Sequence, residues 1–150
     1  MAVVTKKLGS LGTVEEVGGL SSSLGADDGV VSTDVLHDVD LSNETHMDLM
    51  FQIGSGSAWS AGDKLVDVYV IRRQGTAATE EHYEVSGTPT FPQESFVGSI
   101  FAVDGTDDEY YMIRDVPVPA GHFSIGIHNT HSAARDVLVL NIVPWQYEIA

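Results

Sequence analysis

Short alternations of apolar and polar residues predict β-strands along most of the chain after about residue 33. The clearest is His122–Asn129, where Phe123, Ile125 and Ile127 alternate with polar residues and glycine. A period of two places such residues on one face of a strand. Similar runs occupy residues 33–41, 48–53, 66–70, 80–85, 96–103, 109–116 and 137–149. With turn residues between them, these runs predict an all-β fold, an antiparallel β-sandwich of about eight strands with a jelly-roll-like arrangement.

The N-terminal region has a different pattern. Six glycines fall within the first thirty residues, and each would cost a helix about 1 kcal/mol. Single apolar residues recur every three or four positions without a sustained period. We therefore expect an extended, Gly/Ser-rich N-terminal arm over residues 1–32 and a β-sandwich domain over residues 33–150. Thirty extended residues reach on the order of 100 Å, far enough to touch a neighbouring subunit.

The last predicted strand is almost continuously apolar. Between Asp136 and Pro144 the polar interruption is Asn141. Continuous apolarity is typical of a strand that is buried on both faces. In a small sandwich one face meets the core, so we expect the other face to be covered by the arm or by a second subunit. The chain is therefore expected to form a homo-oligomer.

Charge excludes two classes of partner. The chain has 7 Lys and Arg against 22 Asp and Glu, a net charge of −15. Such a surface repels nucleic-acid phosphates and anionic lipids, so we expect neither a nucleic acid nor a membrane as partner. Nine of the acids lie within residues 1–50 beside only Lys6 and Lys7. A surface that meets this region should therefore be neutral or basic.

Composition and motif spacing do not favour an enzyme. The absence of cysteine excludes thiol nucleophiles and thiolate metal ligands. The chain carries no nucleophile elbow and no phosphate-binding glycine motif, and its neighbouring carboxylates alternate between strand faces. His122 and His128 share a strand face but stand about 20 Å apart, too far to bind one ion. We therefore expect no catalytic residues, no cofactor and no histidine-bound metal.

Two features leave alternatives open. The acidic run Asp104, Asp107 and Asp108 is either a solvated turn or a set of oxygen ligands for Ca²⁺. Trp59 lies in a Ser/Gly-rich loop, and Trp145 lies near the C-terminus. Such aromatic residues close the ends of a core or anchor a protein interface, but they can also stack on sugar rings. Trp59 would be the stacking residue if the protein binds a glycan.

The segment 114–130 carries a recognisable pattern, R-x-V-P-V-P-x-G-x-F-x-I-x-I-x-N. Pro117 and Pro119 would stop strand pairing, Gly121 would supply a turn, and Asn129 would adopt a left-handed conformation at the strand end. The pattern resembles small virion structural proteins of tailed bacteriophages, of the jelly-roll capsid decoration (cement) type. Residues 67–76 and Phe96–Phe101 also resemble strands of that family, and the resemblance covers about residues 48–149.

The resemblance implies a non-enzymatic virion protein on the capsid surface. Members of this family bind the assembled major capsid protein, usually as trimers at symmetry axes. The alternative is a carbohydrate-binding module or a virion protein that binds the host surface. Candidate interaction residues are the apolar positions of the arm and the two tryptophans: Val3, Val4, Leu8, Leu11, Val14, Leu20, Trp59 and Trp145.

Overall fold

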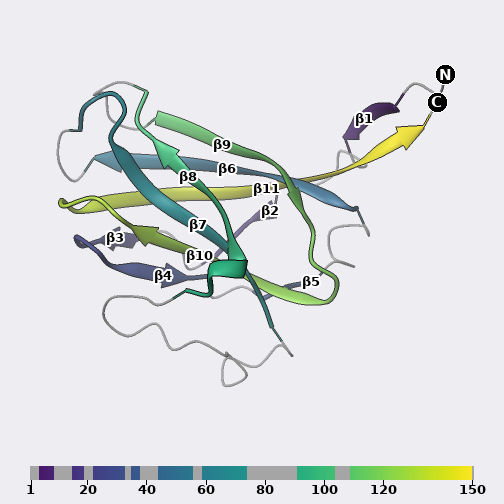
Figure 1. Cartoon of the computed structure of the whole chain (residues 1–150), viewed down its shortest axis with the longest axis horizontal. Coiled ribbons are helices and arrows are strands. Elements are labelled where there is room, and N and C mark those ends of the chain that lie inside the picture. Colours follow the sequence, from purple (N-terminus) through teal and green to yellow (C-terminus); the bar gives the residue numbers. More distant parts are fainter. Residues whose placement is uncertain are drawn as a thin grey trace.

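The computed structural model describes residues 4–8, 15–18, 22–32, 35–37, 44–55, 59–73, 91–103 and 109–149. Nearly all regular structure in these ranges is β-strand (Figure 1). The strands are β1 (Val4–Leu8), β2 (Glu15–Glu16), β3 (Ser22–Leu24), β4 (Gly29–Val31), β5 (Leu36–His37), β6 (His46–Ser55), β7 (Lys64–Arg72), β8 (Phe96–Phe101), β9 (Glu109–Pro117), β10 (His122–Asn129) and β11 (Arg135–Ile149). One short 3₁₀ turn, Gln93–Ser95, precedes β8.

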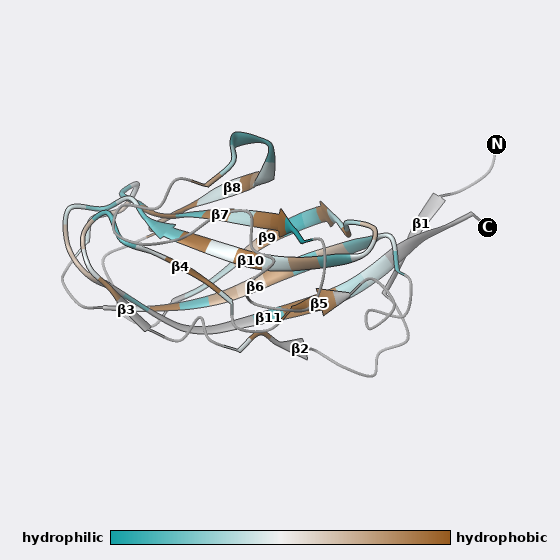
Figure 2. Ribbon diagram, turned by 90° about the horizontal axis from the view of Figure 1, so that it is seen from below, coloured by the Kyte–Doolittle hydropathy of each residue, from teal (hydrophilic) through white to brown (hydrophobic). Residues whose placement is uncertain are grey.

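The strands form two antiparallel sheets that stack on one another (Figure 2). One sheet has the order β1-β11-β6-β9, with β2 and β3 also paired to β11. The other has the order β4-β10-β7-β8, with β5 also paired to β10. Four strand pairs are nested in the sequence: β1–β11 encloses β4–β10, which encloses β6–β9, which encloses β7–β8. The chain therefore has the form of one long hairpin rolled into two layers. This nesting is the arrangement of a jelly roll, so the predicted antiparallel β-sandwich is confirmed.

The core lies between the two layers and follows the alternation in the sequence. Phe123, Ile125 and Ile127 of β10 are fully buried and face Phe51 and its neighbours from β6. The predicted bounds of β10 agree with the structure, whereas β6 and β7 extend a few residues beyond the predicted runs. Of the run 33–41 the described residues place only Leu36–His37 in a strand, and the run 80–85 lies outside the described residues.

The described parts of the N-terminal region lie within the two sheets. β1, β2 and β3 pair with β11, and β4 pairs with β10. Val17 and Leu24 are buried in the hydrophobic core. The extended region thus docks along the sandwich as a series of short strands. Removing residues 1–30 would therefore take buried side chains out of the core.

Two side chains of β11 are fully buried, one on each face of its sheet, and Val143 is half-buried. Ile142 pairs with Leu49 and belongs to the core, whereas Trp145 pairs with His46 and lies outside the core cluster. Both side chains are 0% exposed. Because a single chain already buries Trp145, the atoms that cover it belong to the same chain. Its burial therefore gives no argument for a second subunit.

Candidate interaction surface

Exposed apolar side chains gather along one edge of the sandwich. β8 and β9 are the last strands of their sheets, and they contact each other where the two layers meet. Five large apolar side chains are exposed among the described residues, and all lie on these strands or just after β8: Phe96, Phe101, Val103, Tyr110 and Met112. We call these five residues the β8–β9 edge. Concentration of exposed apolar residues in one place is typical of a protein-binding surface.

Local pairing explains why these side chains face solvent. Tyr110 and Met112 pair with Gln52 and Met50 on the outer face of the β6–β9 sheet, while Ile113 packs inward against the core. A Cβ atom on Gly98 of β8 would lie 3.3 Å from Cδ1 of Ile113. Glycine at this position lets the two strands approach closely. Both strands therefore leave apolar side chains exposed beside their line of contact.

The chain bends beside this edge at a β-bulge. Two residues of β9, Arg114 and Asp115, stand opposite Asp48, and Asp115 has a φ of 61°. The Asp115 backbone N–H donates to Oδ1 of Asp48 at 3.1 Å, and the indole N–H of Trp145 donates to the same oxygen at 2.9 Å. The ring of His46 stacks on Trp145, with centroids 4.7 Å apart. Trp145 therefore holds the outer side of the sheet together and presents no surface to a partner.

The structure separates the other sequence-predicted interaction residues into three groups. Trp59 is 5% exposed and belongs to the core, so neither face of its ring is available for stacking on a sugar. Val4 and Leu8 lie on β1, at the register positions opposite Ile149 and Trp145. The remaining four positions lie outside the described residues: Val3, Leu11, Val14 and Leu20.

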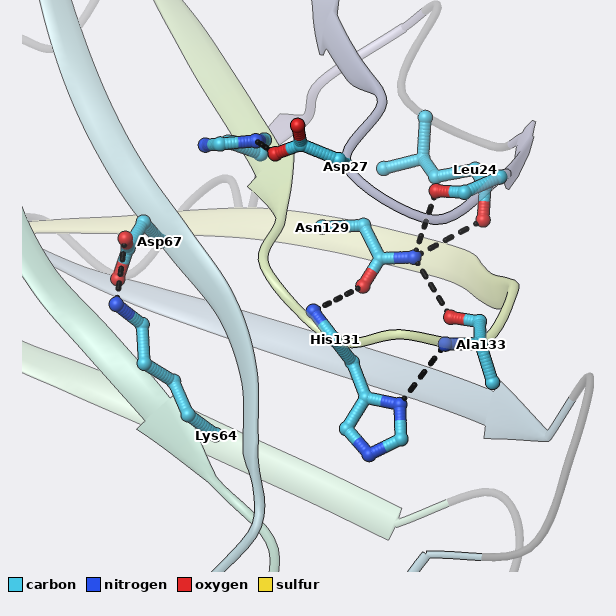
Figure 3. A network of polar contacts seen from close by, with 9 residues as sticks. Leu24, Asp27, Lys64, Asp67, Asn129, His131 and Ala133 are labelled. Atoms are coloured by element: carbon cyan, nitrogen blue, oxygen red, sulfur yellow. Dashed lines mark hydrogen bonds and ion pairs between the residues drawn. The ribbon is translucent and has the colours of Figure 1, made fainter. Parts of the chain in front are cut away.

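At one end of the sandwich, Asn129 organises a network of polar contacts (Figure 3). Its side-chain Nδ2 lies 3.1, 2.8 and 2.9 Å from the carbonyl oxygens of Leu24, Gly25 and Ala133, so its two N–H donors are shared among three acceptors. Its Oδ1 accepts the backbone N–H of His131 at 3.0 Å, and its own N–H donates to the carbonyl of Asp28. This buried side chain fastens the turn before β4 to the loop before β11.

The expected left-handed conformation at Asn129 is wrong. Among the described residues positive φ occurs at Asp27, Asp115, Gly62 and Gly121, and not at Asn129. Asn129 remains in extended backbone because its N–H continues the pairing of β10 while its side chain closes the adjacent turn. The expectation for Gly121 is confirmed, since its φ of 83° turns the chain between β9 and β10.

The described histidines near this end each contact an aspartate. Nε2 of His128 lies 2.8 Å from Oδ1 of Asp27, and Nε2 of His131 lies 3.5 Å from Oδ2 of Asp63. No group of three or more histidines and acids in the described ranges could hold a metal ion. Asp104, Asp107 and Asp108, the candidate calcium ligands, lie outside these ranges. These contacts join β10 and the loop after it to neighbouring turns of the same chain.

A groove of about 630 Å³ lies next to Phe96, between the end of β7, the 3₁₀ turn and the connection from β9 to β10. Its lining is mainly apolar, with Val97, Val118 and Pro119. Arg72 and Glu94 are the charged residues along it. Ser95 is the remaining polar residue along it. In the part of the chain that the structure describes, no helix is long and apolar enough to cross a membrane.

Neither the family models nor the curated proteins include a match to this chain. The geometry of the β8–β9 edge therefore carries the functional argument. Sequence reasoning did not single out this edge, although Tyr110, Tyr111, Met112 and Ile113 form an apolar run without alternation. Such a run in an edge strand must leave one set of large side chains outside the core. The apolar run therefore indicates an exposed surface only once β9 is known to be an edge strand.

Proposed function

We propose that this chain is a non-enzymatic virion structural protein, a capsid decoration (cement) protein of a tailed bacteriophage. It oligomerises, with a trimer favoured, binds the major capsid protein on the head surface and stabilises the head lattice. The observation that carries this proposal is the β8–β9 edge, an apolar strip on a jelly roll whose net charge is −15. An exposed apolar strip on an otherwise acidic surface is typical of a protein-binding site.

The segment with the family-like pattern supports the proposal. Residues 114–130 form the end of β9, the turn at Gly121 and the whole of β10. Pro117 is the last residue of β9, where the pairing with β6 stops. The pattern therefore describes the strand that carries the exposed edge and the strand that follows it. The five residues of the β8–β9 edge lie outside 114–130, so the likeness in this segment bears on the fold that carries the edge.

An oligomer would strengthen binding to a repeated lattice. Each copy presents one β8–β9 edge, which is a small surface for stable attachment by itself. When one copy of an oligomer binds a capsid subunit, the linked copies are held close to the neighbouring capsid subunits. Their effective concentration at those subunits is therefore high, and the oligomer binds more tightly than a single copy. A trimer at a symmetry axis would use this gain, and it would also hold the neighbouring capsid subunits together.

The test uses heads of the virus that encodes the chain, prepared without this protein. Purified protein is added, and binding is measured by co-sedimentation together with the temperature at which the heads release DNA. We expect the wild-type protein to bind saturably and to raise that temperature. Tyr110→Asp, a change at a side chain that is 73% exposed, should weaken binding at least about tenfold.

Ser132→Asp is the matched control, because Ser132 is exposed and belongs to the loop before β11. It adds the same charge and should leave binding unchanged. Wild-type protein that neither sediments with the heads nor alters their stability would overturn the proposal. The glycan-binding alternative has no support from Trp59, which is buried, and we expect no signal for the wild-type protein on a glycan array.

A further inference from the structure

Methionine is the side chain of this protein that is most open to oxidation. The chain has four methionines and no cysteine, so all its sulfur atoms are thioethers. The structure describes three of these residues. Met47 is 0% exposed, Met50 is half-buried, and Met112 is 41% exposed. The fold therefore opens Met112 to solvent more than the other two.

The positions of the strands explain this difference. Met47 lies on the core face of β6, whereas Met50 lies on the outer face of the same strand, opposite Met112 of β9. Met50 also pairs with Asn141 of β11, so it has a strand on each side. Met112 has β6 on one side, and β9 pairs with no other described strand. Met50 is thus a matched comparison for Met112, on the same face but one strand farther from the edge.

A cation lies against the sulfur of Met112. Nε of Arg114 is 3.2 Å from Sδ of Met112, and Arg114 is itself exposed. A thioether is a weak hydrogen-bond acceptor, and a guanidinium has five N–H donors in a fixed fork. An oxygen atom added to the sulfur would be a much stronger acceptor for this cation. Arg114 is therefore placed to hold an oxidised form of Met112.

We propose that Met112 is a site of reversible oxidation by hydroperoxides and that Arg114 holds its sulfoxide. A lone pair of the sulfur attacks one oxygen of hydrogen peroxide, so a sulfur–oxygen bond forms and the oxygen–oxygen bond breaks. The leaving hydroxide takes the proton of the transferred hydroxyl group and becomes water. The sulfur loses two electrons, and the peroxide gains them. Methionine sulfoxide reductases restore the thioether.

Oxidation would change the β8–β9 edge, to which Met112 belongs. A sulfoxide is polar, whereas the thioether is apolar and flexible. A polar group that is covered by a partner costs free energy unless it gains a hydrogen bond there. Association through the edge should therefore weaken when Met112 is oxidised. This consequence rests on the proposed function, whereas the oxidation site itself does not.

The main test is oxidation of the full chain by hydrogen peroxide, followed by digestion and mass spectrometry. Samples taken over time give one rate for each methionine. We expect Met112 to be oxidised at least about threefold faster than Met50 and at least about tenfold faster than Met47. In a denaturing concentration of urea the three rates should agree within about twofold, because the fold no longer protects any of them.

Two results would overturn the oxidation site. One is folded protein in which Met50 is oxidised as fast as Met112. The other is a ratio of rates that stays the same in urea, since the ratio would then arise from neighbouring residues in the sequence. Near-UV circular dichroism, which reports the buried tryptophans, verifies that the protein stays folded during the reaction.

Urea unfolding tests the part given to Arg114. Protein oxidised at Met112 alone is compared with untreated protein, for the wild type and for Arg114→Leu. Oxidation removes apolar contact in both, but only the wild type has the guanidinium that can donate to the sulfoxide. We expect the urea midpoint to fall further in Arg114→Leu than in the wild type. Arg72→Leu, a change at another exposed arginine, should behave like the wild type. Equal falls in all three proteins would refute the role of Arg114.

Binding to heads tests the consequence. Protein oxidised at Met112 should bind at least about threefold more weakly than untreated protein, and treatment with methionine sulfoxide reductases should restore binding. Peroxide should cause the same loss in Met50→Leu and no loss in Met112→Leu. Oxidised wild-type protein that binds as tightly as untreated protein would overturn the inference. Untreated wild-type protein that does not bind heads would refute the proposed function instead, and the oxidation rates would still decide the oxidation site.

Discussion

Replacing Asn129 by alanine should destabilise the protein more than most single substitutions. Its buried side chain shares two N–H donors among three carbonyl groups and accepts one backbone N–H at Oδ1. A hydrogen bond contributes about 1 kcal/mol net, and buried groups left without a partner cost more. We expect Asn129→Ala to lower the free energy of unfolding by about 3–4 kcal/mol. A domain of this size has about 5–15 kcal/mol in total, so the loss is large.

Urea unfolding at neutral pH measures this loss. The transition midpoint should fall while its slope stays the same, because the substitution alters few contacts outside the turn. Asn129→Asp is the informative companion variant. It preserves the shape and the acceptor for the His131 N–H, but it points a carboxylate oxygen at the carbonyls of Leu24, Gly25 and Ala133. At neutral pH it should therefore be less stable than the alanine variant.

The aspartate variant should also recover stability in acid. Burial and the neighbouring carbonyls disfavour the charged form, so the pKa of the introduced carboxyl is raised in the folded state. The destabilisation is then full above the folded-state pKa, shrinks as the pH falls below it, and is smallest below the unfolded value of about 3.9. The protonated carboxyl can donate to one carbonyl. A loss under about 1 kcal/mol in both variants, or no pH difference between them, would refute the role given to Asn129.

Two further predictions concern the outer face of the second sheet. Gly126→Ala should lower the free energy of unfolding by about 1–3 kcal/mol, as measured by urea unfolding. The new Cβ would lie 2.9 Å from Cε1 of Phe91 and 3.0 Å from Cδ1 of Ile71. Unchanged stability would contradict this packing. Burial, and secondly the charge of Asp67, raise the pKa of Tyr69 above its usual 10.0. The unfolded chain therefore loses the Tyr69 proton at a lower pH than the folded chain, so the free energy of unfolding should fall as the pH rises above 10. Tyr69→Phe should reduce that fall in urea unfolding. An equal fall in both proteins would mean that Tyr69 titrates alike in the folded and unfolded states.

The fold class follows from the sequence because local alternation and turn residues agree along most of the chain. β10 is the clearest case, since Phe123, Ile125 and Ile127 alternate without interruption and Gly121 precedes them. Strand order is not encoded locally. The nested pairing of β7 with β8, and of β1 with β11, joins residues at very different separations in the sequence. The alternation of apolar and polar residues therefore predicts the two layers of the sandwich, but it does not predict which strands form the exposed edge.

Short strands in the N-terminal region could not be predicted for a related reason. β2 and β3 have two and three residues, too few to show a period of two. Their position depends on β11, which supplies the partner groups for both. Glycine-rich composition argues against a helix, and the described residues of this region form strands and turns. The composition does not distinguish a free arm from one that docks on its own domain.

Apolar content in the sequence also does not separate contacts within the chain from contacts with a partner. Trp145 lies in the most apolar segment and was expected to mark an interface, yet it is 0% exposed in one chain. Tyr110 follows an acidic run in the sequence and is 73% exposed. Only the apolar surface that remains in water after folding can contribute a hydrophobic gain on association. The search for a partner surface must therefore begin at the unpaired strand margins, where the fold cannot cover its own side chains.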